Sequence, residues 1–263
     1  MRLSLVQMKV LKTPEENREK IERMVKRASK EGADMVVLPE ICCCDYENRQ
    51  FVRFAMEEKS DFLKAMSEIA VENNIILIAG SVPEKDGDNI YNTSFVFGRD
   101  GKLITKHRKV HLFDIDVEGG QYFKESDTFS PGSQVTMFNT EFGKIGLMIC
   151  FDIRFADYAA LMRDCSLIIV PGAFNFTTGV HWETLFRGRA LDNQLFMAGC
   201  APATSEESSY QAYGHSIAVD PWGRVLGQLG TEEGILTVDL DLTERDRVRQ
   251  QLPVLLNRRT DLY

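Results

Sequence analysis

The sequence lacks long apolar runs. No stretch of its 263 residues approaches the ~18 apolar residues that a helix needs to cross a bilayer. Residues 1–9 contain no apolar segment of the kind found in a secretory signal peptide. These absences predict a cytoplasmic chain that does not bind a membrane.

Cysteine and histidine are also scarce, with six and four residues respectively. Without a signal peptide, reduced thiols are the default state. Cys42, Cys43 and Cys44 are adjacent and lack the two-residue gap of metal-binding cysteine pairs. We therefore expect neither a bound metal nor another cofactor.

Basic residues are outnumbered. The formal net charge is −8, and the longest basic cluster covers only residues 106–109. Nucleic acids and anionic membranes select proteins with basic patches. The charge therefore disfavours both as partners and leaves a small molecule as the expected one.

The hydrophobic pattern alternates buried strands with amphipathic helices and then becomes richer in strands. Thr13, Pro14 and Glu16 form a helix start with a capping box, and Gly32 follows that helix. Further helices are predicted at about 62–70, 155–164 and 181–194. Strands are predicted at 2–8, 35–38, 75–79, 93–97, 103–112, 144–149, 167–170, 195–200, 216–219 and 235–239.

This pattern predicts an α/β fold. Its wholly apolar strands need cover on both faces. An α-β-β-α sandwich, with two stacked mixed sheets covered by helices in a single domain over residues 1–263, meets that need. A doubly wound parallel sheet is the alternative.

Three polar residues interrupt or end these strands. Glu40 follows the strand at 35–38, Cys150 ends the strand at 144–149, and Lys109 lies inside the strand predicted at 103–112. Active sites in α/β folds gather where strands end. A carboxylate, a thiol and an amine meeting there could form a covalent catalyst.

The chemistry assigns each a role. Glu40 accepts the proton of Cys150, and the thiolate attacks an amide carbon. Lys109 and the backbone N–H of Phe151 stabilise the oxyanion, ammonia leaves, and Glu40 activates water to hydrolyse the thioester. Taken singly, the three side chains have ordinary structural explanations, so the hypothesis depends on longer motifs.

Such motifs surround all three residues. They read Val37-Leu38-Pro39-Glu40, His107-Arg108-Lys109-Val110-His111-Leu112-Phe113 and Gly146-Leu147-Met148-Ile149-Cys150-Phe151-Asp152-Ile153-Arg154-Phe155. In this order they resemble the base, lysine and nucleophile motifs of the nitrilase superfamily of carbon–nitrogen hydrolases. The resemblance extends over essentially the whole chain, to the terminal Arg259-Thr260-Asp261-Leu262-Tyr263.

The resemblance implies the α-β-β-α fold and the same roles for Glu40, Lys109 and Cys150. It also implies a second glutamate, matched by Glu125, that holds Lys109 and the substrate amide. It further suggests a homodimer or higher homo-oligomer, with helices near the nucleophile and the C-terminal segment at the interface.

Within the superfamily, the sequence resembles the omega-amidase group. The segments that carry this likeness are Gly172-Ala173-Phe174-Asn175-Phe176-Thr177-Thr178-Gly179 and Asp192-Asn193-Gln194. The implied reaction is hydrolysis of the terminal amide of a small dicarboxylic acid monoamide, such as 2-oxoglutaramate or 2-oxosuccinamate. The loop at 41–46 departs from the pattern of that group and leaves the substrate open.

A short acid needs a partner for its free carboxylate. Arg154 is the best candidate, because a guanidinium can bind a carboxylate with two hydrogen bonds. Tyr46, Asn175 and Thr178 are weaker candidates for substrate binding.

Three other interpretations remain. A related enzyme could act on deaminated glutathione or on an N-carbamoyl amino acid. A catalytically silent interaction module is disfavoured by the intact Glu40, Lys109 and Cys150. A papain-like enzyme is disfavoured because no histidine lies in a recognisable partner motif.

Overall fold

The computed structural model describes residues 1–262 and contains two six-stranded sheets and a two-stranded ribbon. The first sheet has the order β14 (Gly234–Asp239), β1 (Arg2–Gln7), β2 (Met35–Val37), β3 (Ile76–Asp86), β4 (Asn89–Phe97) and β5 (Leu103–Arg108). The second has the order β13 (Val225–Gln228), β12 (Ile217–Val219), β11 (Phe196–Cys200), β10 (Leu167–Pro171), β9 (Gly143–Leu147) and β8 (Thr136–Thr140). The ribbon pairs β6 (Asp114–Asp116) with β7 (Tyr122–Lys124).

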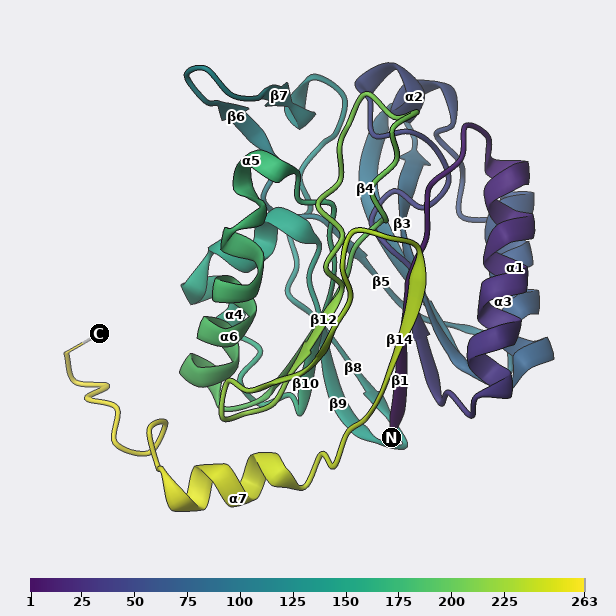
Figure 1. Ribbon diagram of the computed structural model, residues 1–263. Helices are drawn as coiled ribbons and strands as arrows, with labels where there is room; N and C mark the ends of the chain where they lie inside the picture. Colours follow the sequence, from purple (N-terminus) through teal and green to yellow (C-terminus); the bar gives the residue numbers. More distant parts are fainter. Residues whose placement is uncertain (263) are drawn as a thin grey trace.

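Helices cover the outer face of each sheet (Figure 1). The α-helices are α1 (Pro14–Lys30), α2 (Asn48–Arg53), α3 (Asp61–Asn73), α4 (Ala156–Ala160), α5 (Phe176–Gly179), α6 (His181–Asn193) and α7 (Glu244–Gln251). The short 3-10 helices are η1 (Glu125–Asp127) and η2 (Cys150–Arg154). Helices α1 and α3 lie against the first sheet, and α4 and α6 lie against the second, which confirms the predicted α-β-β-α sandwich.

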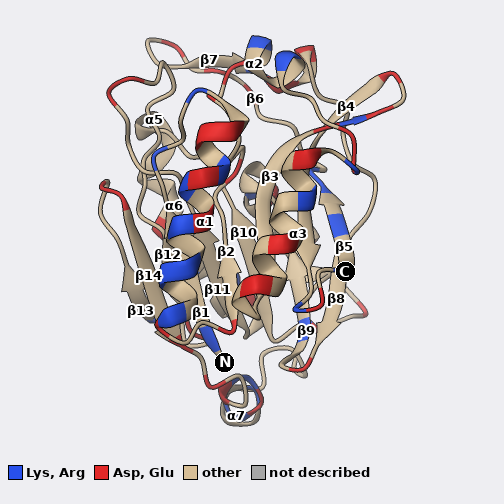
Figure 2. Ribbon diagram, turned by 90° about the vertical axis from the view of Figure 1, so that its right-hand side faces the viewer, with Lys and Arg blue, Asp and Glu red and all other residues tan. Residues whose placement is uncertain are grey.

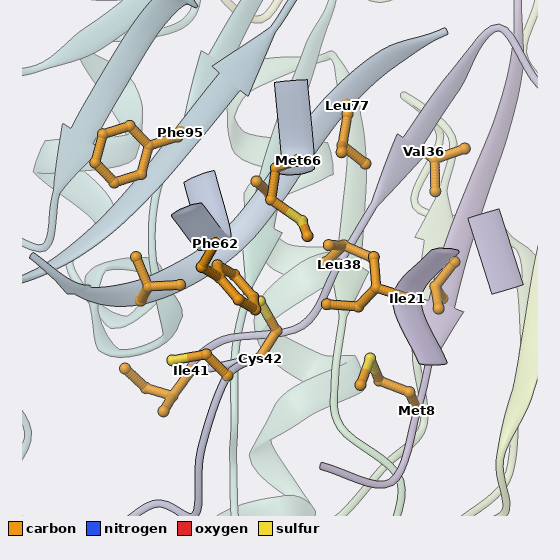
Figure 3. Close-up of a cluster of buried hydrophobic side chains, with 14 of the residues drawn as sticks. Met8, Ile21, Val36, Leu38, Ile41, Cys42, Phe62, Met66, Leu77 and Phe95 are labelled. Carbon is orange, nitrogen blue, oxygen red and sulfur yellow. The ribbon is translucent and has the colours of Figure 1, made fainter. Parts of the chain in front are cut away.

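Strand alternation builds a core on both faces of each sheet. Met35 and Val37 of β2 belong to the cluster between the sheets, whereas Val36 packs toward the helices. Figure 3 shows this outer cluster, in which Val36 lies with Ile21 of α1 and Met66 of α3. Outward faces of α1 and α3 carry mixed charges (Figure 2), so each helix has one apolar face and one solvated face.

Local signals set the helix ends. Thr13 accepts a hydrogen bond from the N–H of Glu16, and the Glu16 side chain accepts one from the N–H of Thr13, which confirms the capping box. Gly32, two residues past the end of α1, has a φ of 86°, a conformation that favours glycine.

Several predicted boundaries were wrong. Lys109 was expected inside a strand, but β5 ends at Arg108. Beyond that point the Lys109 carbonyl accepts from the N–H of Gly132 instead of from a neighbouring strand. The helix expected at 155–164 is only the five-residue α4, because the chain leaves the helix after Ala160 and continues in turns through 161–164.

Other elements were not predicted. They are α2, the β6–β7 ribbon, β8, α5, β13 and α7. Most are short or half exposed, so their apolar periodicity is weak. Within residues 1–262, the structure contains no helix that combines the length and apolar character needed to cross a membrane.

Candidate active site

The residues proposed for catalysis come from the ends of strands in both sheets. Glu40 follows β2 of the first sheet, and Cys150 follows β9 of the second. Lys109 follows β5, and Glu125 opens η1 after the β6–β7 ribbon. All four are buried, and hydrogen bonds or charge interactions connect them.

Lys109 lies between the two glutamates. Its Nζ is 2.9 Å from Oε1 of Glu40 and 2.9 Å from Oε2 of Glu125. Burial by itself would lower the pKa of Lys109, but the charges of Glu125 and Glu40 outweigh it and raise that pKa. The amine is therefore a fixed ammonium, as an oxyanion partner must be.

Two further donors bridge the same glutamates. The Tyr46 hydroxyl lies 2.6 Å from Oε1 of Glu125 and 3.2 Å from Oε1 of Glu40. Asn92 Nδ2 donates to Oε1 of Glu40 at 2.9 Å. Burial, followed by the charges of Glu125 and Glu40, raises the pKa of Tyr46 well above its ordinary value, so its hydroxyl remains a donor.

Backbone donors hold the second oxygen of each carboxylate. The N–H of Ala173 donates to Oε2 of Glu40 at 2.7 Å, and the N–H of Phe113 donates to Oε2 of Glu125 at 2.6 Å. Side-chain and backbone donors together therefore fix both carboxylates in place. Such preorganisation reduces the rearrangement that a reaction would require.

Cys150 sits on a strained turn. It is a non-glycine residue with a φ of 45°, in the left-handed region. A Cβ added to Gly172 would lie 3.2 Å from the Cα of Cys150, so the glycine permits this close approach. Burial first, and then the charge of Glu40, raise the pKa of the thiol, while the Lys109 ammonium lowers it. The resting thiol therefore needs a base when it attacks.

Arg154 lies beside this turn without a carboxylate partner. Its guanidinium is 4.9 Å from the ring centre of Phe174 and 5.5 Å from that of Phe151, and its Nη1 lies 3.2 Å from Nδ1 of His181. Among residues 1–262, no Asp or Glu oxygen forms an ion pair with it, and its buried Nε has no hydrogen-bond partner. Burial lowers the pKa of Arg154, while the nearby Cys150 acts in the opposite direction.

The weaker substrate-binding candidates have local partners. Asn175 Oδ1 accepts from the backbone N–H and the hydroxyl of Thr178 at 3.2 and 3.3 Å, which caps α5. Asn175 Nδ2 donates to the side chain of Gln121, a residue of the turn between β6 and β7. Sequence reasoning missed Gln121 and Asn92, since neither stands in a motif that marks a site.

A small cavity of about 30 Å³ lies beside Glu40. Tyr46, Ala173 and Tyr210 are among the residues that line it. This volume exceeds the ~10–15 Å³ that a water molecule requires. In the described part of the chain, no group of three or more His, Cys, Asp or Glu side chains is arranged to hold a metal ion.

Comparison with known proteins gives matches over nearly the whole chain. The sequence model of the carbon-nitrogen hydrolase family matches residues 2–250. The omega-amidase NIT2 of Bos taurus is 47% identical over 265 residues, which cover 100% of this chain and 96% of that protein. The crystal structure of Saccharomyces cerevisiae Nit3, a nitrilase superfamily member, matches with a TM-score of 0.91 and 39% identity over 98% of this chain and 96% of that one.

A third match is more distant. A mutant of the amidase from Nesterenkonia sp. AN1, carrying acrylamide added at its active-site cysteine, is 25% identical with a TM-score of 0.83 and covers 100% of this chain and 98% of its own. The two-sheet fold and these matches define a hydrolase that acts on carbon–nitrogen bonds of amides. The chain belongs to the carbon–nitrogen hydrolase family of the nitrilase superfamily. In the terminal motif of the resemblance, Tyr263 lies outside the described residues.

Proposed function

We propose that the protein hydrolyses the terminal amide of a small dicarboxylic acid monoamide, of the 2-oxoglutaramate or 2-oxosuccinamate type, to the acid and ammonia. The observation that carries the substrate class is the guanidinium of Arg154, which lies near Cys150 without an Asp or Glu partner among the described residues. A partly buried cation of this kind favours a ligand that brings its own negative charge.

The first half of the reaction forms a thioester. Glu40 takes the proton of Cys150 as sulfur bonds to the amide carbon. The carbonyl oxygen becomes negative and is stabilised by Lys109 and by the N–H of Phe151. As the C–N bond breaks, Glu40 passes the proton to the departing nitrogen, and ammonia leaves. Glu125 holds the ammonium of Lys109 at 2.9 Å, and we assign to it a hydrogen bond from the substrate amide.

The second half hydrolyses the thioester. Glu40 removes a proton from water as the water oxygen bonds to the acyl carbon. The C–S bond then breaks, the carboxylic acid product forms, and the sulfur of Cys150 regains a proton from Glu40. The cavity beside Glu40 offers room for one water molecule close to this base.

The substrate carboxylate is assigned to Arg154. Its planar guanidinium can donate two parallel hydrogen bonds to a carboxylate. The flanking rings of Phe151 and Phe174 leave its buried Nε without a partner in the free protein, so a bound carboxylate would satisfy a donor that is otherwise unpaired. Asn175, Thr178 and Tyr46 complete the proposed pocket, where the first two position the loop before α6.

The relatives support the proposed reaction. A protein that shares 47% of its residues over the full length of this chain is an omega-amidase. The Nesterenkonia amidase carries its adduct on an active-site cysteine. Both are consistent with an amide substrate here, and the second is also consistent with a thiol nucleophile.

The test compares turnover of several substrates, and then compares variants that each lack one thiol. Ammonia release would be measured with 2-oxoglutaramate, 2-oxosuccinamate, the amide of deaminated glutathione and an N-carbamoyl amino acid, together with CO₂ from the last. We expect the two short acids to have the highest kcat/KM. The Cys150→Ala variant should release no ammonia yet unfold at the same temperature as the wild type, whereas Cys165→Ala, which removes a buried thiol elsewhere, should stay active.

Two results would contradict the proposal. Full turnover by Cys150→Ala would remove the thioester mechanism. A higher kcat/KM for the carbamoyl compound than for the short acids, with CO₂ and ammonia released in equal amounts, would replace the substrate class. The mechanism would stay in place.

We also propose that the chain forms a homodimer. Large apolar side chains are exposed near α4 and α6, among them Leu161, Val180 and Leu191. Burial of such side chains against a second copy would remove them from water. Light scattering coupled to size-exclusion chromatography should give twice the chain mass of 29.9 kDa, and a mass equal to one chain would reject the dimer.

A further inference from the structure

The carboxylate of Asp152 is buried and accepts four hydrogen bonds. Oδ1 accepts from the backbone N–H and from Nδ1 of His111, at 2.9 and 2.8 Å. Oδ2 accepts from Nε2 of His107 at 3.1 Å and from the N–H of Ile149 at 3.0 Å. A carboxylate can accept about four such bonds, so this one is saturated.

These donors belong to two segments that carry proposed catalytic groups. His107 and His111 flank Lys109, each at a distance of two residues along the chain. Ile149 directly precedes Cys150. One side chain therefore joins the lysine segment, which continues β5 of the first sheet, to the nucleophile turn, which continues β9 of the second.

The bridge is rigid at both histidines. Thr136 Oγ1 lies 2.9 Å from Nδ1 of His107, so the hydroxyl can donate to this nitrogen while Nε2 donates to Asp152. The ring of His111 stacks on Phe155 with ring centres 3.7 Å apart. Burial alone would raise the pKa of Asp152, but hydrogen bonds from His107 and His111 outweigh it and hold that pKa well below its ordinary value.

Taken by themselves, the backbone hydrogen bonds of Lys109 attach it to segments other than the turn that carries Cys150. Its N–H donates to the carbonyl of Asn92 in β4, and its carbonyl accepts from the N–H of Gly132, both at 2.8 Å. Neither contact reaches the turn that carries Cys150. The side chain of Asp152 supplies that connection through His107, His111 and Ile149.

We propose that Asp152 is a positioning residue, which fixes the Lys109 ammonium relative to the sulfur of Cys150. The inference rests on the proposed function in one respect, because it takes these two groups as the oxyanion donor and the nucleophile. Asp152 itself contacts neither reacting atom. Its effect on the reaction is transmitted by the backbone of the two segments that it joins.

The expected size of this effect follows from geometry. A displacement of about 1 Å between reacting groups can cost about 100-fold in rate. Asp152→Asn keeps the shape but places an NH₂ group against donors that need an acceptor. We therefore expect kcat for 2-oxoglutaramate to fall about 100-fold, with KM changed less than about threefold.

A matched variant controls for stability. Asp220 is also buried, and its carboxylate accepts from the N–H groups of Trp222 and Arg224 at 2.8 and 2.9 Å, in the turn between β12 and β13. Asp220→Asn should lower the melting temperature without changing kcat. If both variants lose the same fraction of kcat, or neither loses any, Asp152 is only structural and the inference fails.

A second pair of variants covers the case in which Asp152→Asn does not fold. His111 is partly exposed, so its substitution should be tolerated. His111→Asn retains a donor for Asp152, whereas His111→Phe retains the stacking on Phe155 and loses that donor. We expect kcat to fall more than about tenfold in His111→Phe and to be largely restored in His111→Asn. Equal kcat in the two variants would overturn the inference.

A readout without substrate separates this inference from the proposed function. Alkylation of Cys150 by iodoacetamide, followed by peptide mass spectrometry across a range of pH, reports the field of Lys109 at the sulfur. In Asp152→Asn the rate at neutral pH should fall about tenfold, with the profile moved to higher pH. If the wild-type enzyme does not hydrolyse 2-oxoglutaramate but Asp152→Asn still shows this shift, only the substrate proposal is wrong. If the wild-type enzyme hydrolyses 2-oxoglutaramate but Asp152→Asn keeps the wild-type alkylation profile, only the proposed role of Asp152 is wrong.

Discussion

The hydroxyl of Tyr46 donates a hydrogen bond to Oε1 of Glu125, which lies 2.6 Å away. The ring is held by aromatic neighbours, with its centre 4.5 Å from that of Tyr210 and 5.2 Å from that of Phe51. The hydroxyl is therefore a fixed donor for the pair of carboxylates around Lys109. The sequence suggested Tyr46 for substrate binding, and its contacts in the free protein are to the proposed catalytic glutamates.

Replacement of Tyr46 by phenylalanine should reduce turnover. The change removes one donor from two buried carboxylates and leaves the aromatic packing in place. Loss of a hydrogen bond to a charged group costs about 1.5–3 kcal/mol. We expect kcat to fall about 10- to 100-fold. The control is Tyr158→Phe, which removes a hydroxyl that donates to the carbonyl of Gln134, outside the proposed site. Equal kcat in the two variants would show that Tyr46 does not support the carboxylates.

Replacement of Lys109 by methionine should affect both activity and stability. It leaves Glu40 and Glu125 buried side by side without the cation that joins them. Removal of one partner from a buried ion pair typically costs about 3–5 kcal/mol. Urea unfolding at neutral pH should show a loss of this size, together with the absence of ammonia release.

A matched variant checks this loss of stability. The control is Lys106→Met, since Lys106 is partly exposed and its buried partner Glu84 keeps Arg108. A loss in Lys109→Met no larger than in this control would contradict the account.

Sequence reasoning singled out Glu40 and Cys150 because each lies just past an apolar strand and within a motif that resembles those of the superfamily. It misjudged the place of Lys109, which follows β5 instead of lying within it. Alternation of side chains continues past the end of a strand, so it cannot mark where the ladder of hydrogen bonds stops. The catalytic role of Lys109 stays a prediction, whereas the element expected to carry it was wrong.

The supporting residues were harder to find. Asn92 donates a hydrogen bond to Glu40, which is 52 positions away in the sequence, and Tyr46 donates one to Glu125, which is 79 positions away. Local patterns carry no information on such distant pairs. Strand β8 escaped prediction for a related reason, since it buries Phe138 but exposes Met137 and so lacks a clear alternation of apolar and polar residues.

Substitution of Arg154 tests the recognition of the free carboxylate. The comparison uses glutaric acid monoamide and pentanamide, which have equal chain lengths and differ in the acid group. Arg154→Gln should raise KM for the acid about 10- to 100-fold, as expected for the loss of a charge-assisted hydrogen bond. Arg154→Lys keeps the charge without the planar fork and should be intermediate. For pentanamide both variants should resemble the wild type. Equal effects on the two amides would reject the carboxylate role.

The last prediction concerns alkaline pH and the buried thiols. Burial, followed by the charge of Cys44, raises the pKa of Cys42 to about 12, and burial also raises the pKa of Cys165 to about 11. In the unfolded chain such thiols ionise near ~8.5. Above that pH the unfolded state binds fewer protons than the native state, so the free energy of unfolding decreases as pH rises. This contribution to stability is fully present below pH ~8.5 and is lost progressively as pH rises toward the folded pKa.

Each such thiol contributes a slope of up to about −1.4 kcal/mol per pH unit in this window. Urea unfolding under reducing conditions between about pH 8 and 10.5 would measure the total. Cys42→Ala should be less stable than the wild type at about pH 8 because of lost packing, but its stability should decline less steeply with pH. The control is Ile69→Val, a core truncation without a thiol, which should keep the wild-type slope. If Cys42→Ala also keeps that slope, ionisation of Cys42 does not couple to unfolding, because its thiol would titrate alike in the folded and unfolded chain.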